Sequence, residues 1–247
     1  MTERPVTSEP ISSPQADYDA LRYVSPETPC PYLPGRRSRN EAFLIGLIDR
    51  AMYERLMAHG FRRSGRIIYR PVCRGCHECR QLRVPVDRFT PTRSMRRVWR
   101  RNLDVRAEAG ELIATDEKYV LFERYLDFQH DDTMARTYES FHEFLYDSPT
   151  TTCEFSYRLG ERLIGVSIVD VCQKGLSSVY MYFDPDYASR SLGTFSILWE
   201  IEYCRREGFA YYYLGFFVAG GKKMAYKSRF RPNEVLSGAD SWLSFRE

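Results

Sequence analysis

The sequence lacks any apolar run of about 18 residues, so no stretch predicts a membrane-spanning helix. It also lacks the basic-then-apolar N-terminal pattern of a secretory signal. Its seven cysteines are an odd number, which argues against a framework of disulfides. These absences predict a cytoplasmic protein with reduced thiols and no membrane partner.

Lysine is absent from residues 55–106, although this segment holds 15 arginines. The segment contains only three acidic residues, so its net charge is +12. Because the whole chain carries +3, the residues outside this segment have a net charge of −9. Such a block repels itself unless an anion neutralises it, and guanidinium groups suit phosphate oxygens. The simpler alternative is that these arginines form a solvated surface without a bound partner. We favour a nucleic acid, and RNA rather than DNA, because no DNA-reading motif is present.

The first half of the chain predicts three kinds of segment. Residues 1–17, rich in Pro, Ser and Thr, predict a disordered tail. A capping box at Ser38 and Glu41, followed by apolar residues at helical spacing, predicts one helix that ends at Gly60. Strands are expected at residues 66–72 and 81–86, the second at a sheet edge because of Pro85. A basic helix should follow, and then a strand at 103–107.

The second half predicts a sheet with crossing helices. Apolar periodicity indicates helices at 116–130 and 138–146, a hairpin of strands 153–159 and 162–172, and later a strand at 176–183, a helix at 193–207 and strands at 210–216 and 234–242. The fold class is α+β. We divide the chain into the tail 1–17, a smaller Cys-containing α/β domain at 18–110 and a larger domain at 111–247.

The loop between residues 184 and 193 opens directly onto the helix at 193–207. The first N–H groups of a helix have no intrahelical partner, so this junction predicts a cradle for an anion. Its letters Arg190-Ser-Leu-Gly193-Thr-Phe195 resemble the coenzyme A loop of GNAT acetyltransferases, which has the form Arg/Gln-x-x-Gly-x-Gly/Ala. Phe195 replaces the last small residue, so we expect no coenzyme A. An ordinary crossover connection is the alternative.

Three cysteines stand two residues apart, at Cys73, Cys76 and Cys79. Thiolates at this spacing can face one metal ion, with Cys30 as a fourth ligand or His77 as a rival. The set would suit zinc or an iron–sulfur cluster, and the sequence does not decide between them. Reduced structural cysteines in a turn are the alternative.

The acids that could take part in chemistry are Asp184 and Asp186, which follow a strand directly. Tyr180, Tyr182 and Tyr213 could supply hydroxyl groups nearby. A proline flanked by two aspartates is also typical of a simple turn.

Several unusual stretches occur together and in a fixed order, and together they cover roughly residues 20–240. They are Cys30-Pro-Tyr-Leu33, Cys73-Arg-Gly-Cys-His-Glu-Cys79, Arg83-Val-Pro-Val86, Phe89-x-Pro-x-Arg93, Tyr182-Phe-Asp-Pro-Asp186, Leu192-Gly-Thr-Phe-Ser-Ile197, Tyr213-Leu-Gly215 and Lys223-Met-x-Tyr-Lys-x-x-Phe-Arg-Pro232. This set resembles the aminoacyl-tRNA–protein transferases of the N-degron pathway. The chain length is similar to the bacterial aspartate/glutamate leucyltransferase branch rather than to the longer eukaryotic arginyltransferases.

The resemblance implies a GNAT-like catalytic domain behind a smaller N-terminal domain. It implies transfer of leucine from leucyl-tRNA to proteins that begin with Asp or Glu, without a small-molecule cofactor. Eukaryotic relatives bind an iron–sulfur cluster or zinc through N-terminal cysteines, at a different spacing. The alternatives are arginyl transfer, a zinc-containing RNA-binding module without catalysis, and a small-molecule acetyltransferase.

The same resemblance, with the residue chemistry above, assigns expected roles. Asp184, Tyr182 or Tyr213 would handle the amine proton, and backbone N–H groups near Leu214–Phe216 would face the oxyanion. The acceptor carboxylate would meet cations drawn from Arg36, Arg74, Arg80, Lys227 and Arg229. The tRNA phosphates would meet Arg93, Arg96, Arg97, Arg100, Arg101, Lys222 and Lys223. A metal would be held by Cys30, Cys73, Cys76 and Cys79.

Overall fold

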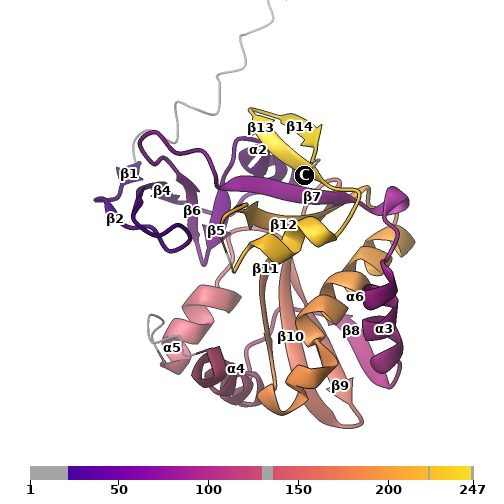
Figure 1. The fold of residues 1–247 in the computed structure, drawn as a ribbon. Coiled ribbons are helices and arrows are strands. Elements are labelled where there is room, and N and C mark those ends of the chain that lie inside the picture. The colour runs from indigo at the N-terminus through magenta and orange to yellow at the C-terminus, as the bar shows by residue number, and fades with distance from the viewer. Residues whose placement is uncertain (1–21, 130–135, 222, 246–247) are drawn as a thin grey trace, which may run out of the picture.

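The computed structural model describes residues 22–129, 136–221 and 223–245. Within them an eight-stranded sheet lies beside a four-stranded sheet, and helices cover both faces of the larger one (Figure 1). The protein is thus a mixed α/β fold with a large sheet. The tail expected over 1–17 and the tRNA contact expected at Lys222 fall outside the described residues.

The described strands run in chain order as follows: β1 (Tyr23–Val24), β2 (Thr28–Pro29), β3 (Arg37–Ser38), β4 (Asn40–Leu44), β5 (Arg62–Ser64), β6 (Ile67–Pro71), β7 (Arg80–Pro85), β8 (Val105–Gly110), β9 (Thr152–Leu159), β10 (Arg162–Val171), β11 (Gly175–Phe183), β12 (Tyr211–Phe217), β13 (Glu234–Gly238) and β14 (Ser241–Ser244). The α-helices are α2 (Arg50–Ala58), α3 (Arg93–Arg101), α4 (Asp116–Gln129), α5 (Tyr138–Phe141) and α6 (Leu192–Arg206). Shorter turns of 3₁₀- or π-helix are η2 (Val86–Arg88), η3 (His142–Tyr146), η4 (Pro185–Arg190) and η5 (Ala225–Arg229).

The helix predicted from Ser38 to Gly60 is wrong in its first half. That part forms β4, which pairs with β6, and α2 begins only at Arg50. The helix cap is Asp49, whose carboxylate accepts the Met52 N–H at 2.7 Å.

Burial in β4 alternates as in a strand, and Glu41 and Phe43 both point inward. Glu41 is buried because its carboxylate forms ion pairs with Arg22 and Arg70, each at 2.6 Å. Both partners are distant in the sequence, so the capping-box pattern at Ser38 and Glu41 concealed a residue that is held by tertiary contacts.

The position predicted for the strand at 81–86 is also wrong. The large sheet has the order β14-β13-β7-β12-β11-β10-β9-β8, so β7 lies inside it rather than at an edge. Pro85 is tolerated because it is the last residue of β7, where β13 no longer pairs; within β7, β13 pairs with Leu82 and Arg83. The sheet therefore takes strands from both sides of residue 110, where the sequence predicts a domain boundary.

Most other elements were predicted correctly. The hairpin β9–β10, the crossover β11–α6–β12 and the helices α3, α4 and α5 with η3 all lie where the periodicity placed them. The last predicted strand, 234–242, is a hairpin of β13 and β14. The part of the chain that the structure describes contains no helix long and apolar enough to cross a membrane.

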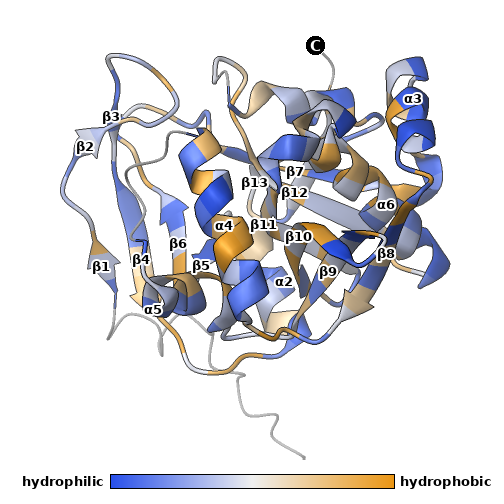
Figure 2. Ribbon diagram, turned by 90° about the horizontal axis from the view of Figure 1, so that it is seen from below, coloured by the Kyte–Doolittle hydropathy of each residue, from blue (hydrophilic) through white to orange (hydrophobic). Residues whose placement is uncertain are grey.

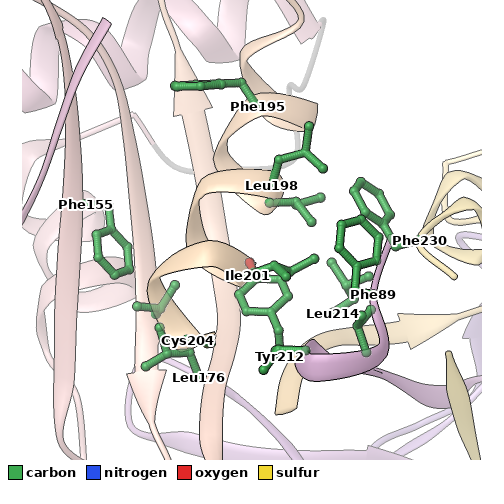
Figure 3. Close-up of a cluster of buried hydrophobic side chains, with 14 of the residues drawn as sticks. Phe89, Phe155, Leu176, Phe195, Leu198, Ile201, Cys204, Tyr212, Leu214 and Phe230 are labelled. Carbon is green, nitrogen blue, oxygen red and sulfur yellow. The ribbon is translucent and has the colours of Figure 1, made fainter. Parts of the chain in front are cut away.

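The two faces of the sheet carry separate cores. On one face α6 packs against β11 and β12, and Leu198, Ile201 and Cys204 point into the core that Figure 3 shows. On the other face α4 packs against β10 and β11 through Phe122 and Leu126. The hydrophobic stripe of α4 and the largely hydrophilic surface of α3 are visible in Figure 2.

One carboxyl group, Glu200, is buried in the α6 core. It accepts hydrogen bonds from the hydroxyls of Tyr157, at 2.8 Å, and of Tyr212. Burial raises its pKa from 4.5 to about 7 in spite of these bonds. Between these two values the folded state holds a proton that the unfolded chain has lost, so stability falls as the pH rises through this window.

We therefore expect Glu200 to contribute a drop of about 3 kcal/mol to the unfolding free energy between pH 4.5 and pH 7. Glu200→Gln should remove this slope, as measured by denaturant unfolding at several pH values. Glu202→Gln, at a half-exposed position on the same helix, should keep it. An unchanged slope in Glu200→Gln would contradict the assignment.

Candidate functional site

A large cavity lies where the eight-stranded sheet splits. The parallel strands β11 and β12 pair only from Gly175 to Ser177, although both strands run further. Beyond that point they diverge, and residues of both strands, the start of α6 and η5 enclose a cavity of about 810 Å³. The split thus opens the sheet from within and creates a site lined by backbone as well as side chains.

The charge of this cavity is one-sided. Among the described residues that line it, Arg62, Lys223 and Lys227 are cationic and none is Asp or Glu. Arg62 and Lys227 are 7% and 8% exposed, and within the described ranges neither forms an ion pair with a carboxylate. Buried charges without a counter-ion are costly, so this arrangement favours an anionic ligand that supplies one.

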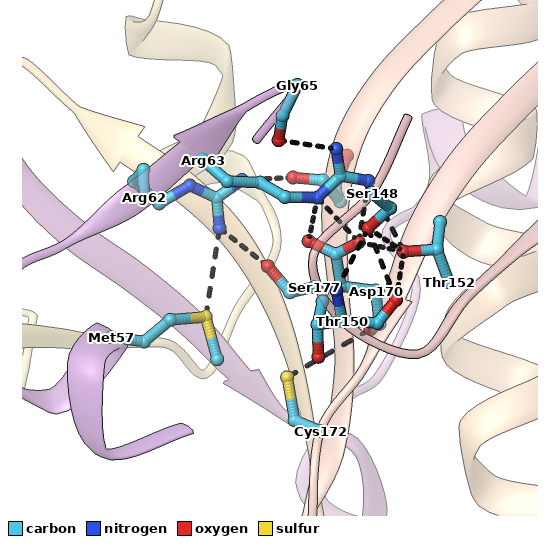
Figure 4. A network of polar contacts seen from close by, with 11 residues as sticks. Met57, Arg62, Arg63, Gly65, Ser148, Thr150, Thr152, Asp170, Cys172 and Ser177 are labelled. Atoms are coloured by element: carbon cyan, nitrogen blue, oxygen red, sulfur yellow. Dashed lines mark hydrogen bonds and ion pairs between the residues drawn. The ribbon is translucent and has the colours of Figure 1, made fainter. Parts of the chain in front are cut away.

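Arg62 stands at the point where the sheet splits. Its guanidinium donates to the Ser177 hydroxyl, at 2.6 Å, and to the Ser178 carbonyl, which β12 no longer reaches (Figure 4). Gly215 lies against it with φ +80°, and a Cβ there would come within 3.1 Å of a guanidinium nitrogen. Glycine at this position lets the Arg62 side chain reach the cavity. No motif in the sequence points to this role of Arg62.

The next residue provides a contrast. Arg63 points to the other side of β5 and forms a fully buried ion pair with Asp170, with N–O distances of 2.7 to 2.9 Å. Thr152 adds a hydrogen bond to the same carboxylate, and Figure 4 shows the network. Arg63 is therefore a structural cation with its own counter-charge, whereas Arg62 has none among the residues that the structure describes.

Lys227 is held at the cavity by a hydrogen bond to the Phe216 carbonyl, 2.8 Å long. Burial, together with the nearby Arg62 charge, lowers the pKa of its ammonium group from 10.5 to about 7. Its charge therefore changes close to neutral pH.

The N-terminal turn of α6 also faces the cavity, through Ser191, Leu192, Gly193 and Thr194. Ser191 takes a left-handed conformation with φ 58° and turns the chain into the helix. This end of α6 is the cradle that the sequence predicts, and its positive dipole end suits an anion. Arg190 is not free to join it, because it pairs with Asp104 at 2.8 Å.

Asp184, Tyr182 and Tyr213 lie outside the cavity lining, whereas Tyr180 lines it. Asp184 is 1% exposed, caps η4 and forms ion pairs with Arg124 and Arg162 at 2.9 and 2.6 Å. The hydroxyl of Tyr182 lies 3.0 Å from that of Tyr146, and burial raises its pKa. Tyr213 donates to Glu54 at 3.0 Å. Their catalytic roles stay predictions that no contact with the cavity supports.

Of the five cations expected to meet the acceptor carboxylate, Lys227 alone is among the cavity's lining residues. Arg74 lies 3.6 Å from Glu27, and Arg80 lies over the ring of Phe245. Arg36 and Arg229 are exposed elsewhere. For Arg36, Arg74, Arg80 and Arg229 the role stays a prediction.

The predicted tRNA contacts gather on two surfaces. Arg93, Arg96, Arg97, Arg100 and Arg101 are all exposed on α3, which packs against α6 (Figure 1). In the described ranges none of them forms an ion pair with a carboxylate, so the charge of the helix is uncompensated. Lys223 is exposed at the cavity itself.

The four predicted metal ligands lie near one another. Burial, and then the charges of Cys73, Cys30 and Cys76, raise the pKa of Cys79 to about 12. The turn holds Gly75 at φ +63°. As a donor set the thiols suit zinc or a cluster, but no described group of three or more Cys, His, Asp or Glu converges as a metal ion requires. A metal at these cysteines stays a prediction, and no step below depends on it.

Two family models together match most of the chain. The family model described as "Arginine-tRNA-protein transferase, N terminus" matches residues 28–97, and its "C terminus" counterpart matches residues 117–237. The chain belongs to the arginine-tRNA-protein transferase family. The resemblance seen in the sequence is thereby confirmed.

Relatives in this family are named aspartate/glutamate leucyltransferase. The chain is 35% identical to the one from Hahella chejuensis, over 90% of this chain and 96% of the relative. It is 40% identical to the one from Stenotrophomonas maltophilia, over 92% and 94% of the two chains. Among solved structures, FemX shares the fold with a TM-score of 0.52 at 10% identity, over 77% of this chain and 67% of that one.

Proposed function

We propose that this enzyme transfers leucine from leucyl-tRNA to the α-amino group of proteins that begin with Asp or Glu, as the names of its relatives suggest. Such transfer would mark those proteins for degradation through the N-degron pathway. The observation that carries the proposal is the cavity at the split of the sheet, with two buried cations that form no ion pair with a described carboxylate. We place the reaction in the cytoplasm, and the split parallel strands support a GNAT-like catalytic domain.

The acceptor's side-chain carboxylate would bind Arg62 and Lys227. It would supply the counter-charge that these cations lack within the described residues, and the fork of Arg62 can receive both of its oxygens. The same positive charge would lower the pKa of the neighbouring α-amino group, which is about 7.7 to 8.0 in free peptides. The cavity would then collect the amine in its neutral, nucleophilic form without a carboxylate base.

The leucyl ester would lie between α6 and β12. Apolar lining residues such as Met181, Ile197 and Leu214 could hold its side chain, and the α6 N-terminus could hold a phosphate. The amine nitrogen attacks the ester carbon, the C–N bond forms, the C–O bond breaks, and one proton passes from the amine to the departing ribose oxygen. Ester to amide is downhill, so neither a nucleotide nor a small-molecule cofactor is required.

The oxyanion of the intermediate needs hydrogen-bond donors. The ladder between β12 and β7 shifts register between Tyr213 and Gly215, so Leu214 is an extra, bulged residue beside the cavity. We propose that backbone N–H groups around Leu214–Phe216 stabilise the oxyanion.

The deciding experiment uses purified protein, radiolabelled leucyl-tRNA or arginyl-tRNA, and peptides that begin with Asp, Glu or Lys. Leucine should appear on the Asp and Glu peptides alone. Arginine on the same peptides would keep the family and replace the donor. No transfer from either donor, with tRNA binding intact, would favour the RNA-binding module.

The pH dependence of kcat/KM tests whether the charge of Lys227 binds the acceptor. In the wild type, kcat/KM for the acceptor should rise as the α-amino group loses its proton and fall again as Lys227 loses its charge, which begins near pH 7. Lys227→Arg keeps its charge throughout, so only the rising limb should remain between pH 6 and pH 9.

Lys223→Arg is the matched control, because Lys223 lines the same cavity but is exposed. It should keep the bell-shaped profile. A falling limb that persists in Lys227→Arg would assign that limb to another group.

A further inference from the structure

A second cavity, of about 450 Å³, lies further along α6, between that helix, α3 and the loop after η2. None of the described residues that line it also lines the cavity at the split of the sheet. It lies within the size range of ligand pockets. The function proposed above makes no use of it.

Its floor is apolar and rigid. Leu198 and Ile201 of α6 are almost fully buried and face Phe89, as Figure 3 shows. Trp99 of α3 forms a further wall, and its ring is fixed by packing against Phe195 at a centroid distance of 5.7 Å. The cavity therefore offers a preformed apolar slot with an aromatic wall.

Its mouth is positively charged. The charge of Arg205 is compensated, because it forms an ion pair with Glu202 at 2.5 Å; it also donates to the Val86 carbonyl at 2.7 Å. Arg96 donates to the Pro91 carbonyl at 2.5 Å, a bond that leaves its charge uncompensated. Arg100 also lines the cavity and has no carboxylate partner among the described residues. A ligand that fits must be flat and apolar in one part and anionic beside it.

We propose that this cavity takes an unstacked nucleobase from the unpaired 3′ stretch of the tRNA, with the adjoining phosphates on Arg96 and Arg100. The inference rests on the proposed function, which brings a tRNA to the enzyme. Single-stranded RNA is commonly held in this way, with bases against aromatic rings and phosphates on arginines.

The position along α6 agrees with this occupant. Thr194 lines the main cavity and Ile201 lines the second, so the two lie seven residues apart, about 10 Å along the helix. The ester that reacts is on the last nucleotide of the tRNA. The nucleotides just before it are unpaired and close enough for one of their bases to reach this distance along α6.

The test uses an RNA hairpin that carries the acceptor stem and the unpaired 3′ end, with each unpaired base removed in turn. The wild type should bind one of these abasic hairpins roughly tenfold more weakly than the intact one, the effect of one stacked base. Trp99→Leu should bind the intact hairpin and that abasic hairpin alike. If the wild type binds every abasic hairpin within twofold of its affinity for the intact one, the proposal is overturned. The cavity would then be assigned to a protein partner.

Arg100→Gln and Arg97→Gln form a matched pair that tests the same point without disturbing the core. Both side chains are exposed on α3, but only Arg100 lines the cavity. Arg100→Gln should weaken binding more than Arg97→Gln and reduce the sensitivity to the missing base. Equal effects would show a general attraction for phosphates and overturn the proposal. Leucine transfer is assayed in parallel, so that the proposed activity and the proposed base site are tested separately. An enzyme that transfers leucine but binds intact and abasic hairpins equally contradicts the base site alone.

Discussion

Replacement of Arg62 by Met is expected to lower kcat/KM for an Asp-initiated peptide by about 10²–10³-fold, the usual effect of removing one partner of a buried charge pair. The side chain has no counter-ion of its own among the described residues, so the acceptor carboxylate would lose its principal partner. The protein should stay folded, with an unfolding free energy within about 1 kcal/mol of wild type, because the variant removes an uncompensated buried charge.

The readout that identifies the role is discrimination between acceptors. Wild type should strongly prefer a peptide that begins with Asp over one that begins with Asn. Arg62→Met should reduce this preference, while its KM for leucyl-tRNA stays near the wild-type value. An Arg62→Met enzyme that keeps the full Asp-over-Asn preference would show that Arg62 does not read the carboxylate.

Replacement of the neighbouring Arg63 by Met should have the opposite outcome, with a loss of about 3–5 kcal/mol in unfolding free energy. It leaves Asp170 fully buried without its cation. Because native proteins have only about 5–15 kcal/mol of stability, this single change brings the chain close to unfolding. Denaturant titration of Arg62→Met and Arg63→Met side by side measures the contrast.

The double variant Arg63→Met/Asp170→Leu is the internal check. Replacing both charges with apolar groups removes the orphaned carboxylate, so much of the lost stability should return. If Arg63→Met costs less than about 1 kcal/mol, the ion pair is not a main support of the fold.

Arg62 also marks the limit of what the sequence could predict about the site. It is one of 15 arginines between residues 55 and 106, and Arg63 stands next to it. Among the described residues, a carboxylate pairs with Arg63 and none pairs with Arg62. That carboxylate belongs to Asp170, more than a hundred residues away in the sequence. Lys227 was found because it lies in a motif that resembles the family, whereas Arg62 lies in none of the motifs quoted.

The predicted elements show the same division between local and distant information. The hairpin β9–β10 and the crossover β11–α6–β12 could be read from the sequence because their patterns lie within a few neighbouring residues. The strand β4 could not, because Glu41 is buried only with the help of Arg22 and Arg70. The place of Asp184 after a strand is likewise local and could be read, whereas its ion pairs with Arg124 and Arg162 depend on distant residues.

The place of β7 inside the large sheet also has a consequence for biosynthesis. Pro85 pairs with Tyr211, so the ribosome releases β7 more than 120 residues before its partner β12 exists. At about 5–20 residues per second the nascent chain must wait roughly 6–25 s, with Leu82 and Val84 uncovered. The sheet that carries the site is completed only after β12 and β13 have been synthesised, and until then this strand is a segment of the newborn chain that a chaperone would need to shield.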